Sequence, residues 1–248
     1  GEDITKMKSS YELHSRMQMI FQDPYASLDP RMSVSEIIAE PLKIHKLCKT
    51  RDELDERIKE LMDTVGLAER FALSYPHELD GGRRQRIGIA RALALKPKFI
   101  VCDEPVSALD VSIQAQILNL MQDLQERDGY TYMFITHDLS VVKHISNEIL
   151  VMYLGQAVEK CGSDELFDRP LHPYTKALLA AIPEPVVKKE RRRELLKGEI
   201  VSPIAPKPGC RFAARCPFAT ERCHTVNPTL QEISKGHFVS CHRVEEIN

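Results

Sequence analysis

The chain has 248 residues, with 34 Lys or Arg, 36 Asp or Glu and a formal net charge of -2 at pH 7. This length allows one substantial hydrophobic core and a small appendage. The balanced charge argues against a general affinity for nucleic acid or an anionic membrane. No stretch approaches the ~20 apolar residues of a membrane span, and the first thirty residues lack the apolar core of a signal peptide. We therefore expect a soluble, cytosolic chain.

The first predicted elements are a short strand, a loop and a helical region. Met19 to Phe21 has the character of a strand end, and prolines within residues 22–30 interrupt regular structure. From Val34 to Arg86 apolar side chains recur at helical spacing, for example from Leu54 to Val65, and Gly66 follows as a helix terminator. The pattern predicts a helical insertion between two strands of one sheet.

Two further strands and a helix are expected next. Phe99 to Cys102 is a continuous apolar run, which is typical of a buried strand. Apolar positions between Ile113 and Leu124 form one stripe of a helix, and Tyr132 to Ile135 predicts the following strand. Packing alone accounts for these segments.

The last third of the chain is predicted to be less regular. Residues 149–159 predict a β-hairpin with its turn at Gly155. Several prolines and the charged run 188–194 then predict a boundary near residue 185. The run contains three consecutive arginines, but flanking glutamates and prolines favour a solvated linker over a nucleic-acid site.

Three polar residues follow the two apolar strands and carry the chemistry. Asp103 and Glu104 come directly after the first strand, and His137 comes after the second. Open α/β sheets bind their ligands at the carboxyl ends of strands, where a carboxylate can seek a metal and another can activate water. Asp103 could instead cap the next segment, and a lone His at a strand end is more often packed. The combination, with residues 107–110 behind it, favours a phosphate-hydrolysis site.

A pair of glycines supplies a second feature. Gly81 and Gly82 are placed to open a helix, whose N-terminal amides carry partial positive charge and can accept a phosphate. Without context such a pair is usually only a turn.

Read together, these segments resemble the motifs of ABC-type ATPases, in the order of that family. Residues 21–24 resemble its Q-loop, 79–93 its signature motif and helix, 99–104 its Walker B strand, 107–110 its D-loop and 136–138 its switch histidine.

The resemblance implies a role for each candidate residue. Asp103 would hold Mg²⁺, and Gln22 would supply an amide oxygen to Mg²⁺ or to the attacking water. Glu104 would act as general base, and His137 would donate to the γ-phosphate of ATP. Asp110 would contact the opposite subunit, because such ATPases are dimers with composite sites. The segment facing the ATP of the partner subunit would be Asp80, Gly81, Gly82 and Arg83.

Two residues depart from the family's signature. Asp80 replaces the usual Ser and Arg83 the usual Gln. A carboxylate should repel a γ-phosphate, whereas Arg83 or Arg84 could neutralise either anion. We therefore expect that an arginine offsets the charge of Asp80 in the signature motif and that ATPase activity is retained, in an altered form or unchanged.

A P-loop sequence, Gly-x-x-x-x-Gly-Lys-[Ser/Thr], is not found in the chain. Residues 1–4 resemble a segment that lies well after the P-loop in ABC ATPases. We therefore expect an N-terminally truncated version of a longer subunit, which lacks its first strands and is inactive alone. The alternative is a degenerate subunit that lends only signature contacts to a partner, and the intact Asp103, Glu104 and His137 argue against it.

The tail indicates the branch of the family. Residues 171–179 and 209–217 resemble the segments that follow the core in ATPase subunits of dipeptide and oligopeptide importers, closest to the second of the paired ATPases. Of the seven cysteines, three are scattered and four lie in the tail, at Cys210, Cys216, Cys223 and Cys241. Some members of these importers carry a 4Fe-4S cluster there. We rank that cluster first, Zn²⁺ second and disulfides third, and unligated cysteines remain an alternative.

These inferences combine into one expectation. The fold is α/β, a P-loop NTPase of the ABC type without its N-terminal strands, with a core at 1–160, a helical subdomain at about 30–90 and a Cys-containing extension at 161–248. The function is ATP hydrolysis that powers peptide import from the cytoplasmic face of the cell membrane, where the subunit is peripheral. The expected partners are a second ATPase subunit in a homo- or heterodimer, membrane permease subunits and, indirectly, a peptide-binding protein, with no nucleic acid.

Overall fold

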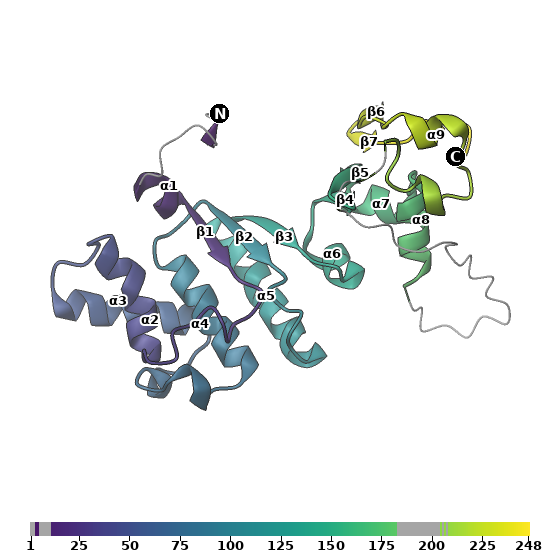
Figure 1. Cartoon of the computed structure of the whole chain (residues 1–248). Helices are drawn as coiled ribbons and strands as arrows, with labels where there is room; N and C mark the ends of the chain where they lie inside the picture. The colour runs from purple at the N-terminus through teal and green to yellow at the C-terminus, as the bar shows by residue number, and fades with distance from the viewer. Residues whose placement is uncertain (1–2, 5–10, 183–203, 205, 207) are drawn as a thin grey trace. The chain divides into compact units, whose positions relative to one another are not determined.

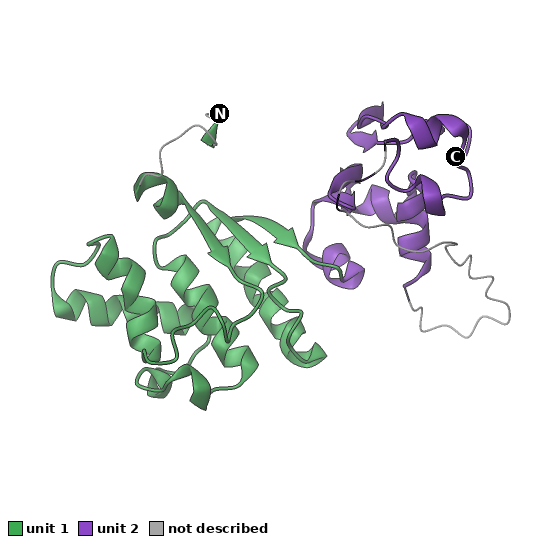
Figure 2. Ribbon diagram, in the orientation of Figure 1, with its two compact units in different colours: residues 1–137 green, residues 138–248 purple. Residues whose placement is uncertain are grey.

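The computed structural model describes residues 3–4, 11–182, 204, 206 and 208–248. Two compact units make up the chain, residues 1–137 and residues 138–248 (Figures 1 and 2). The expected boundary near residue 185 and the charged run 188–194 lie outside the described residues. The expected division of the chain after residue 160 stays a prediction.

A three-stranded parallel sheet in the order β1-β2-β3 forms the centre of the first unit. Ile20 pairs with Cys102, and Cys102 with Phe134, so the strands end at one common edge. Side chains alternate between the two faces of a strand. Ile100 and Cys102 are accordingly buried, whereas Met133 on the opposite face is 49% exposed. The strands are β1 (Met17–Ile20), β2 (Phe99–Asp103) and β3 (Thr131–Ile135).

Helices occupy the chain between β1 and β2, which confirms the predicted helical insertion (Figure 1). A capping box starts the first of them, because the backbone N–H of Ser33 donates to the carboxylate of Glu36 at 2.8 Å and the Ser33 side chain accepts from the backbone N–H of Glu36. Gly66, at φ +65°, follows the end of the second, as its sequence position predicted. The helices are α2 (Val34–Ile44), α3 (Arg51–Thr64) and α4 (Gly81–Leu93), with 3₁₀ turns at Glu69–Phe71 and Pro76–Glu78.

Two more helices complete the first unit. α1 (Tyr11–Arg16) precedes β1, and α5 (Val111–Asp128) connects β2 to β3. The buried side chains Ile117 and Met121 of α5 lie on the predicted apolar stripe. α4 contacts both β1 and α5, so the signature-like segment and the strand ends belong to one packed body.

The second unit contains an antiparallel sheet in the order β4-β5-β7-β6. Its first two strands confirm the predicted hairpin, with Tyr153 opposite Gln156 across the turn. The last two strands, from the tail, were not predicted. The elements are α6 (Leu139–Ile145), β4 (Glu148–Tyr153), β5 (Gln156–Gly162), α7 (Ser163–Asp168), α8 (Pro173–Ala180), a 3₁₀ turn at Ala213–Arg215, α9 (Glu221–Thr225), β6 (Gln231–Ser234) and β7 (His237–Val239).

Phe212 anchors the core of the second unit. This residue is 1% exposed and belongs to one buried cluster with Tyr153, Val158 and Leu166. The ring centroids of Phe212 and Tyr153 are 5.3 Å apart in an edge-to-face arrangement, which adds to the area that both rings bury. The cysteine-containing tail is thereby fixed to the β4-β5 hairpin.

Within the described residues, no helix is long and apolar enough to cross a membrane.

Candidate functional site

Three of the predicted site residues meet at the carboxyl end of the parallel sheet. Gln22 donates from Nε2 to Glu104 Oε2 at 3.0 Å, and His137 Nδ1 lies 3.0 Å from Glu104 Oε1. Gln22 follows β1, Glu104 follows β2 and His137 follows β3, so parallel pairing in register brings these distant residues together. The Glu104 side chain is 23% exposed and the His137 side chain 74% exposed, which leaves the group open to a ligand.

The backbone at Glu104 is held in a conformation that few side chains adopt. Its φ is +42°, in the left-handed region. The backbone N–H of Glu104 donates to Ile135 O at 2.9 Å, and Ser107 Oγ donates to Glu104 O at 3.0 Å. Such strain persists only where neighbouring contacts enforce it, and it is common at active sites. The structure therefore fixes the direction of the Glu104 carboxylate.

Hydrogen bonding favours the charged form of that carboxylate. The bond to His137 is the main influence that lowers the pKa of Glu104 below its ordinary value, against an opposing effect of burial. Bonds from Ser107 and Gln22 lower the pKa further. An ionised Glu104 can accept a proton, which is what the predicted general base requires.

Asp103 lines a groove beside this group. The groove has a volume of about 800 Å³ and is also lined by Gln22, by Val101 and by Pro41 of α2. Asp103 is half-buried at the last position of β2. A carboxylate and a side-chain amide oxygen are ligands that suit Mg²⁺. The residues present therefore fit the metal that the sequence predicted.

Arg91 of α4 links the loop after β1 to the signature-like helix. Its Nη1 donates to Ser27 O at 2.7 Å, and its guanidinium lies 5.9 Å from the ring centroid of Phe21. Burial lowers the pKa of Arg91. A half-buried cation needs hydrogen-bond partners, so this contact holds the two segments together.

The signature-like segment begins α4, as predicted, and Asp80 is its N-cap. Asp80 Oδ1 accepts from the backbone N–H of Arg83 at 2.8 Å, and the Arg83 guanidinium forms an ion pair with Asp80 Oδ2. Arg83 also lies 4.8 Å from the ring centroid of Phe71. Of the two arginines that could neutralise Asp80, the structure selects Arg83, because Arg84 is buried and stacks on Tyr25 at 3.6 Å.

The glycine pair has a packing role that the sequence did not reveal. A Cβ on Gly82 would lie 2.6 Å from Ile113 Cγ2, and one on Gly81 would lie 3.2 Å from Leu109 Cδ2. The start of α4 therefore packs directly against the segment that begins α5. Asp110 occupies the N-cap position of α5 without a side-chain capping bond and is exposed.

In the second unit, the tail cysteines come together around one small cavity. Cys210, Cys216, Cys223 and Cys241 all line it, together with His172 and Phe212. All seven cysteines of the chain are free thiols. Gly209, at φ +96°, makes the close approach possible, because a Cβ there would lie 2.5 Å from Cys223 O. The backbone N–H of Cys210 donates to the same oxygen at 2.8 Å.

Nearby backbone N–H groups favour the charged form of three of these cysteines. Burial raises the pKa of the Cys210, Cys216 and Cys241 thiols, and in each case a hydrogen bond from the backbone N–H two residues later opposes this rise. A donor aimed at sulfur stabilises a thiolate, the form that binds metals. The donors belong to Phe212, Phe218 and Arg243.

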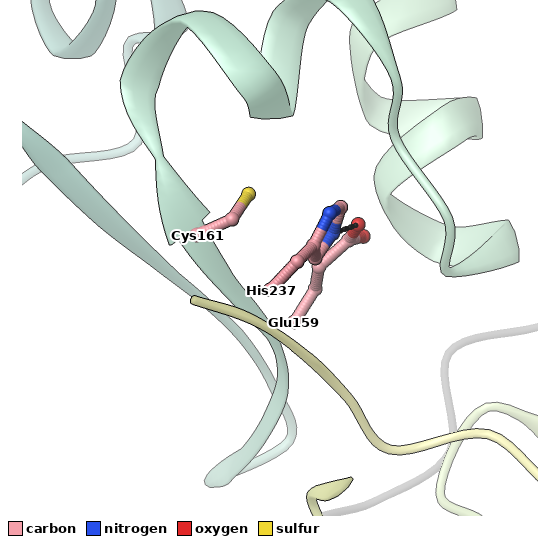
Figure 3. Close-up of side chains that lie close together, drawn as sticks. All are labelled: Glu159, Cys161 and His237. Carbon is pink, nitrogen blue, oxygen red and sulfur yellow. Dashed lines mark hydrogen bonds and ion pairs between the residues drawn. The ribbon is translucent and has the colours of Figure 1, made fainter. Parts of the chain in front are cut away.

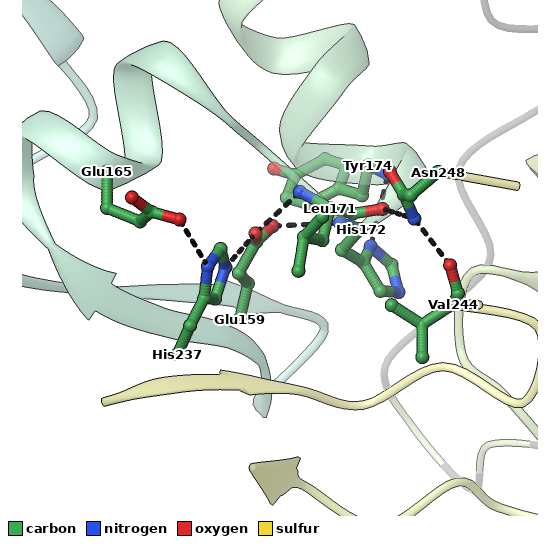
Figure 4. A network of polar contacts seen from close by, with 8 residues as sticks. All are labelled: Glu159, Glu165, Leu171, His172, Tyr174, His237, Val244 and Asn248. Carbon is green, nitrogen blue, oxygen red and sulfur yellow. Dashed lines mark hydrogen bonds and ion pairs between the residues drawn. The ribbon is translucent and has the colours of Figure 1, made fainter. Parts of the chain in front are cut away.

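A different group of possible metal ligands lies on β5 and β7 of the same unit. Among the described residues, only Glu159, Cys161 and His237 place three possible ligand atoms within 4.8 Å of one another (Figure 3). His237 Nε2 lies 2.8 Å from Glu159 Oε1, and the backbone N–H groups of Leu171 and His172 donate to the two oxygens of Glu159 at 2.7 and 3.0 Å (Figure 4). A buried carboxylate needs such partners. Hydrogen bonding within the fold therefore accounts for this cluster.

Comparisons with known proteins agree with this geometry. Residues 1–107 match the family model described as "ABC transporter", and residues 158–223 match "Oligopeptide/dipeptide transporter, C-terminal region". The oligopeptide transport ATP-binding protein OppF of Salmonella typhimurium is 53% identical over 251 residues, which cover 100% of this chain and 75% of that protein. AppF of Bacillus subtilis is 51% identical over 249 residues, which cover 98% and 75%.

Two solved structures share the fold. The ATP-binding cassette MJ0796, a dimer bound to ADP and Pi, has a TM-score of 0.56 at 30% identity and covers 63% of this chain and 68% of its own. CbiO1 from Clostridium perfringens, part of an ABC transporter complex, has a TM-score of 0.57 at 26% identity and covers 64% and 61%. With identities above 50% across three quarters of its relatives' length, the chain belongs to the ABC-type ATPase family of oligopeptide transport ATP-binding proteins.

Proposed function

We propose that this chain is the ATP-hydrolysing subunit that powers peptide import through an ABC permease. The observation that carries the proposal is the convergence of Gln22 and His137 on Glu104 at the end of β2. The names of its relatives, which are oligopeptide transport proteins, support the choice of peptide as the transported solute.

Glu104 is the general base of the proposed reaction. Its carboxylate accepts a proton from water as the water oxygen bonds to the γ-phosphorus, and the bond from that phosphorus to the β-γ bridging oxygen breaks. The products are ADP and phosphate. His137 donates from Nδ1 to the ionised Glu104, so its Nε2 is available to a γ-phosphate oxygen when the ring is an imidazolium.

Asp103 and Gln22 are the proposed Mg²⁺ ligands. The Gln22 amide nitrogen is engaged by Glu104, which leaves the amide oxygen for a cation. Mg²⁺ supplies charge neutralisation to the phosphates when it is bound.

A second ATPase subunit, identical or different, would complete the site. Helix α4 with its Asp80–Arg83 cap would face the nucleotide of that partner, and the exposed Asp110 would contact it. The dimeric arrangement of MJ0796 with ADP and Pi supports this assignment.

Permease subunits are the proposed partners of the first unit's helical side. The groove between the loop after β1 and α2 adjoins Gln22, so a permease segment bound near it would sense changes at the site. We therefore propose that the chain is a peripheral subunit at the cytoplasmic face of the membrane and that a separate peptide-binding protein chooses the solute.

The test of the ATPase proposal is Glu104→Gln in the assembled transporter. We expect ATP turnover to fall by about 10²- to 10⁴-fold, the usual contribution of a general base, while ATP binding and subunit association persist. Glu126→Gln, on α5 and away from the site, is the matched control and should leave turnover unchanged. A Glu104→Gln transporter with normal turnover would remove Glu104 from the reaction.

We further propose that the tail cysteines hold a 4Fe-4S cluster. Four thiols around one cavity, three of them receiving a backbone N–H, provide the ligand set. Tetrahedral zinc with Zn–S bonds of about 2.3 Å would hold its sulfurs about 3.8 Å apart. These cysteines do not form a group with three ligand atoms within 4.8 Å, and this wider spacing favours the larger cluster.

Anaerobic reconstitution of the chain tests the cluster. We expect about four irons and four sulfides per chain with a broad visible absorbance band, and loss of both in Cys216→Ser. Cys48→Ser, which changes a cysteine outside the tail, should load normally. Stoichiometric zinc without iron would identify zinc as the bound metal. If the chain bound neither iron nor zinc, the four thiols would be unligated.

A further inference from the structure

His172 is the one nitrogen-bearing side chain from outside the tail, among the described residues, that lines the cysteine cavity. It is 1% exposed and precedes α8 as its N-cap residue. Its ring centroid lies 5.8 Å from that of Phe212, which sits between two of the cysteines in the sequence. His172 is thus buried at the wall of the cavity without a part in the ATPase site.

A network of polar contacts fixes the position of the ring. Both oxygens of Glu159 accept backbone N–H groups of the segment that leads into α8, including that of His172 at 3.0 Å (Figure 4). Glu159 is held in turn by His237 at 2.8 Å, and His237 Nδ1 lies 3.4 Å from Glu165 Oε1. These contacts connect β5, β7 and α7 to the start of α8, so His172 has little freedom to move away.

Its ring nitrogens have different roles. Nδ1 accepts a hydrogen bond from the backbone N–H of Tyr174 at 3.1 Å, so Nδ1 carries no proton. A neutral imidazole must then carry its proton on Nε2. Nε2 therefore has no lone pair for a metal, and the ring can act toward sulfur only as a donor.

We propose that His172 donates a hydrogen bond from Nε2 to a sulfur of the group held by the four tail cysteines and so tunes its reduction potential. The assignment rests on the cluster proposed above. Thiolate and sulfide sulfurs are acceptors, and a hydrogen bond to them stabilises the more negative, reduced state. His172 is then a positioning and tuning residue, and the chain's Glu159–His237 network serves to hold it.

The experiment compares midpoint potentials of the reconstituted full chain. His172→Asn keeps a short acceptor for the Tyr174 N–H, since Asn is a good N-cap, but removes the Nε2 donor. His172→Gln places an amide N–H near the lost position. We expect His172→Asn to shift the oxidised-to-reduced ratio at the wild-type midpoint about tenfold toward the oxidised form, or about 59 mV for one electron. His172→Gln should stay within about threefold of wild type.

Tyr153→Phe is the matched control for packing, because Tyr153 contacts Phe212 without lining the cavity. It should leave the potential unchanged. A fully loaded His172→Asn chain with the wild-type potential would overturn the donor role and leave the cluster intact. Loss of iron from both His172 variants but not from Tyr153→Phe would make His172 a ligand or scaffold and overturn it also. A wild-type chain that binds no cluster would instead refute the proposed function of the cysteines.

Discussion

The capped signature segment allows a prediction that separates stability from activity. Asp80 both caps α4 and pairs with Arg83, with side chains 57% and 43% exposed. Loss of an N-cap destabilises by about 1 kcal/mol, and an exposed ion pair contributes about 0.5 kcal/mol. Asp80→Ala should therefore lower the unfolding free energy by about 1.5 kcal/mol, or Tm by about 3–6 °C. Asp80→Ser keeps a capping oxygen and should lower Tm by only about 1–2 °C.

Activity should depend on the pair in a different way. Two unit charges about 5 Å apart interact by about 1–3 kcal/mol at effective dielectric constants between those of water and a protein surface. In wild type the Arg83 cation cancels the repulsion between Asp80 and a γ-phosphate. Arg83→Ala should therefore reduce ATP turnover about five- to 150-fold when Asp80 is present, and less than about threefold in an Asp80→Ser background.

A double-mutant cycle on ATP turnover of the assembled transporter measures this coupling, with calorimetric unfolding of each variant as the stability control. Additive effects of the two substitutions would refute compensation by Arg83. An Asp80→Ser enzyme that turns over ATP orders of magnitude faster than wild type would also refute it, because Arg83 would then fail to neutralise the charge of Asp80 in wild type. Equal loss of Tm in Asp80→Ala and Asp80→Ser would refute the capping role.

Three other predictions concern single contacts. In His137→Ala, the pKa of Glu104 should rise toward its ordinary value because the main hydrogen bond that lowers it is gone. A ¹³C NMR titration of the Glu104 carboxyl should then show its ionisation at higher pH than in wild type. Gly82→Ala should destabilise the first unit by about 1–3 kcal/mol through contact with Ile113, and Ile113→Ala should restore part of this in urea unfolding. His237→Ala removes a partner from a fully buried carboxylate and should destabilise the second unit by about 3 kcal/mol, whereas an unchanged urea midpoint would contradict this role.

The strand ends of the first unit could be predicted because their apolar runs are short and end in polar residues. A continuous apolar run such as Phe99 to Cys102 is typical of a buried strand, and parallel strands deliver whatever follows them to one edge. Glu104 and His137 were therefore expected to be near each other, and they are. The left-handed backbone of Glu104 could not be expected from the sequence. The contacts that enforce it come from Ile135, on a different strand, and from Ser107 in the turn that follows Glu104.

The cysteine region shows where such prediction stops. Spacing along the chain left clusters, zinc, disulfides and free thiols all open, because irregular backbone carries no periodicity that fixes distance. The approach of Cys210 to Cys223 depends on Gly209, whose missing Cβ allows two backbones to touch. The position of His172 depends on β5 and β7, where Glu159 and His237 form a hydrogen bond although they are 78 positions apart in the sequence. That contact holds the segment before α8 and so places His172 at the cavity wall. Local sequence cannot specify a contact of that range, so the donor that we assign to the cavity follows from the tertiary packing of α8 against the tail.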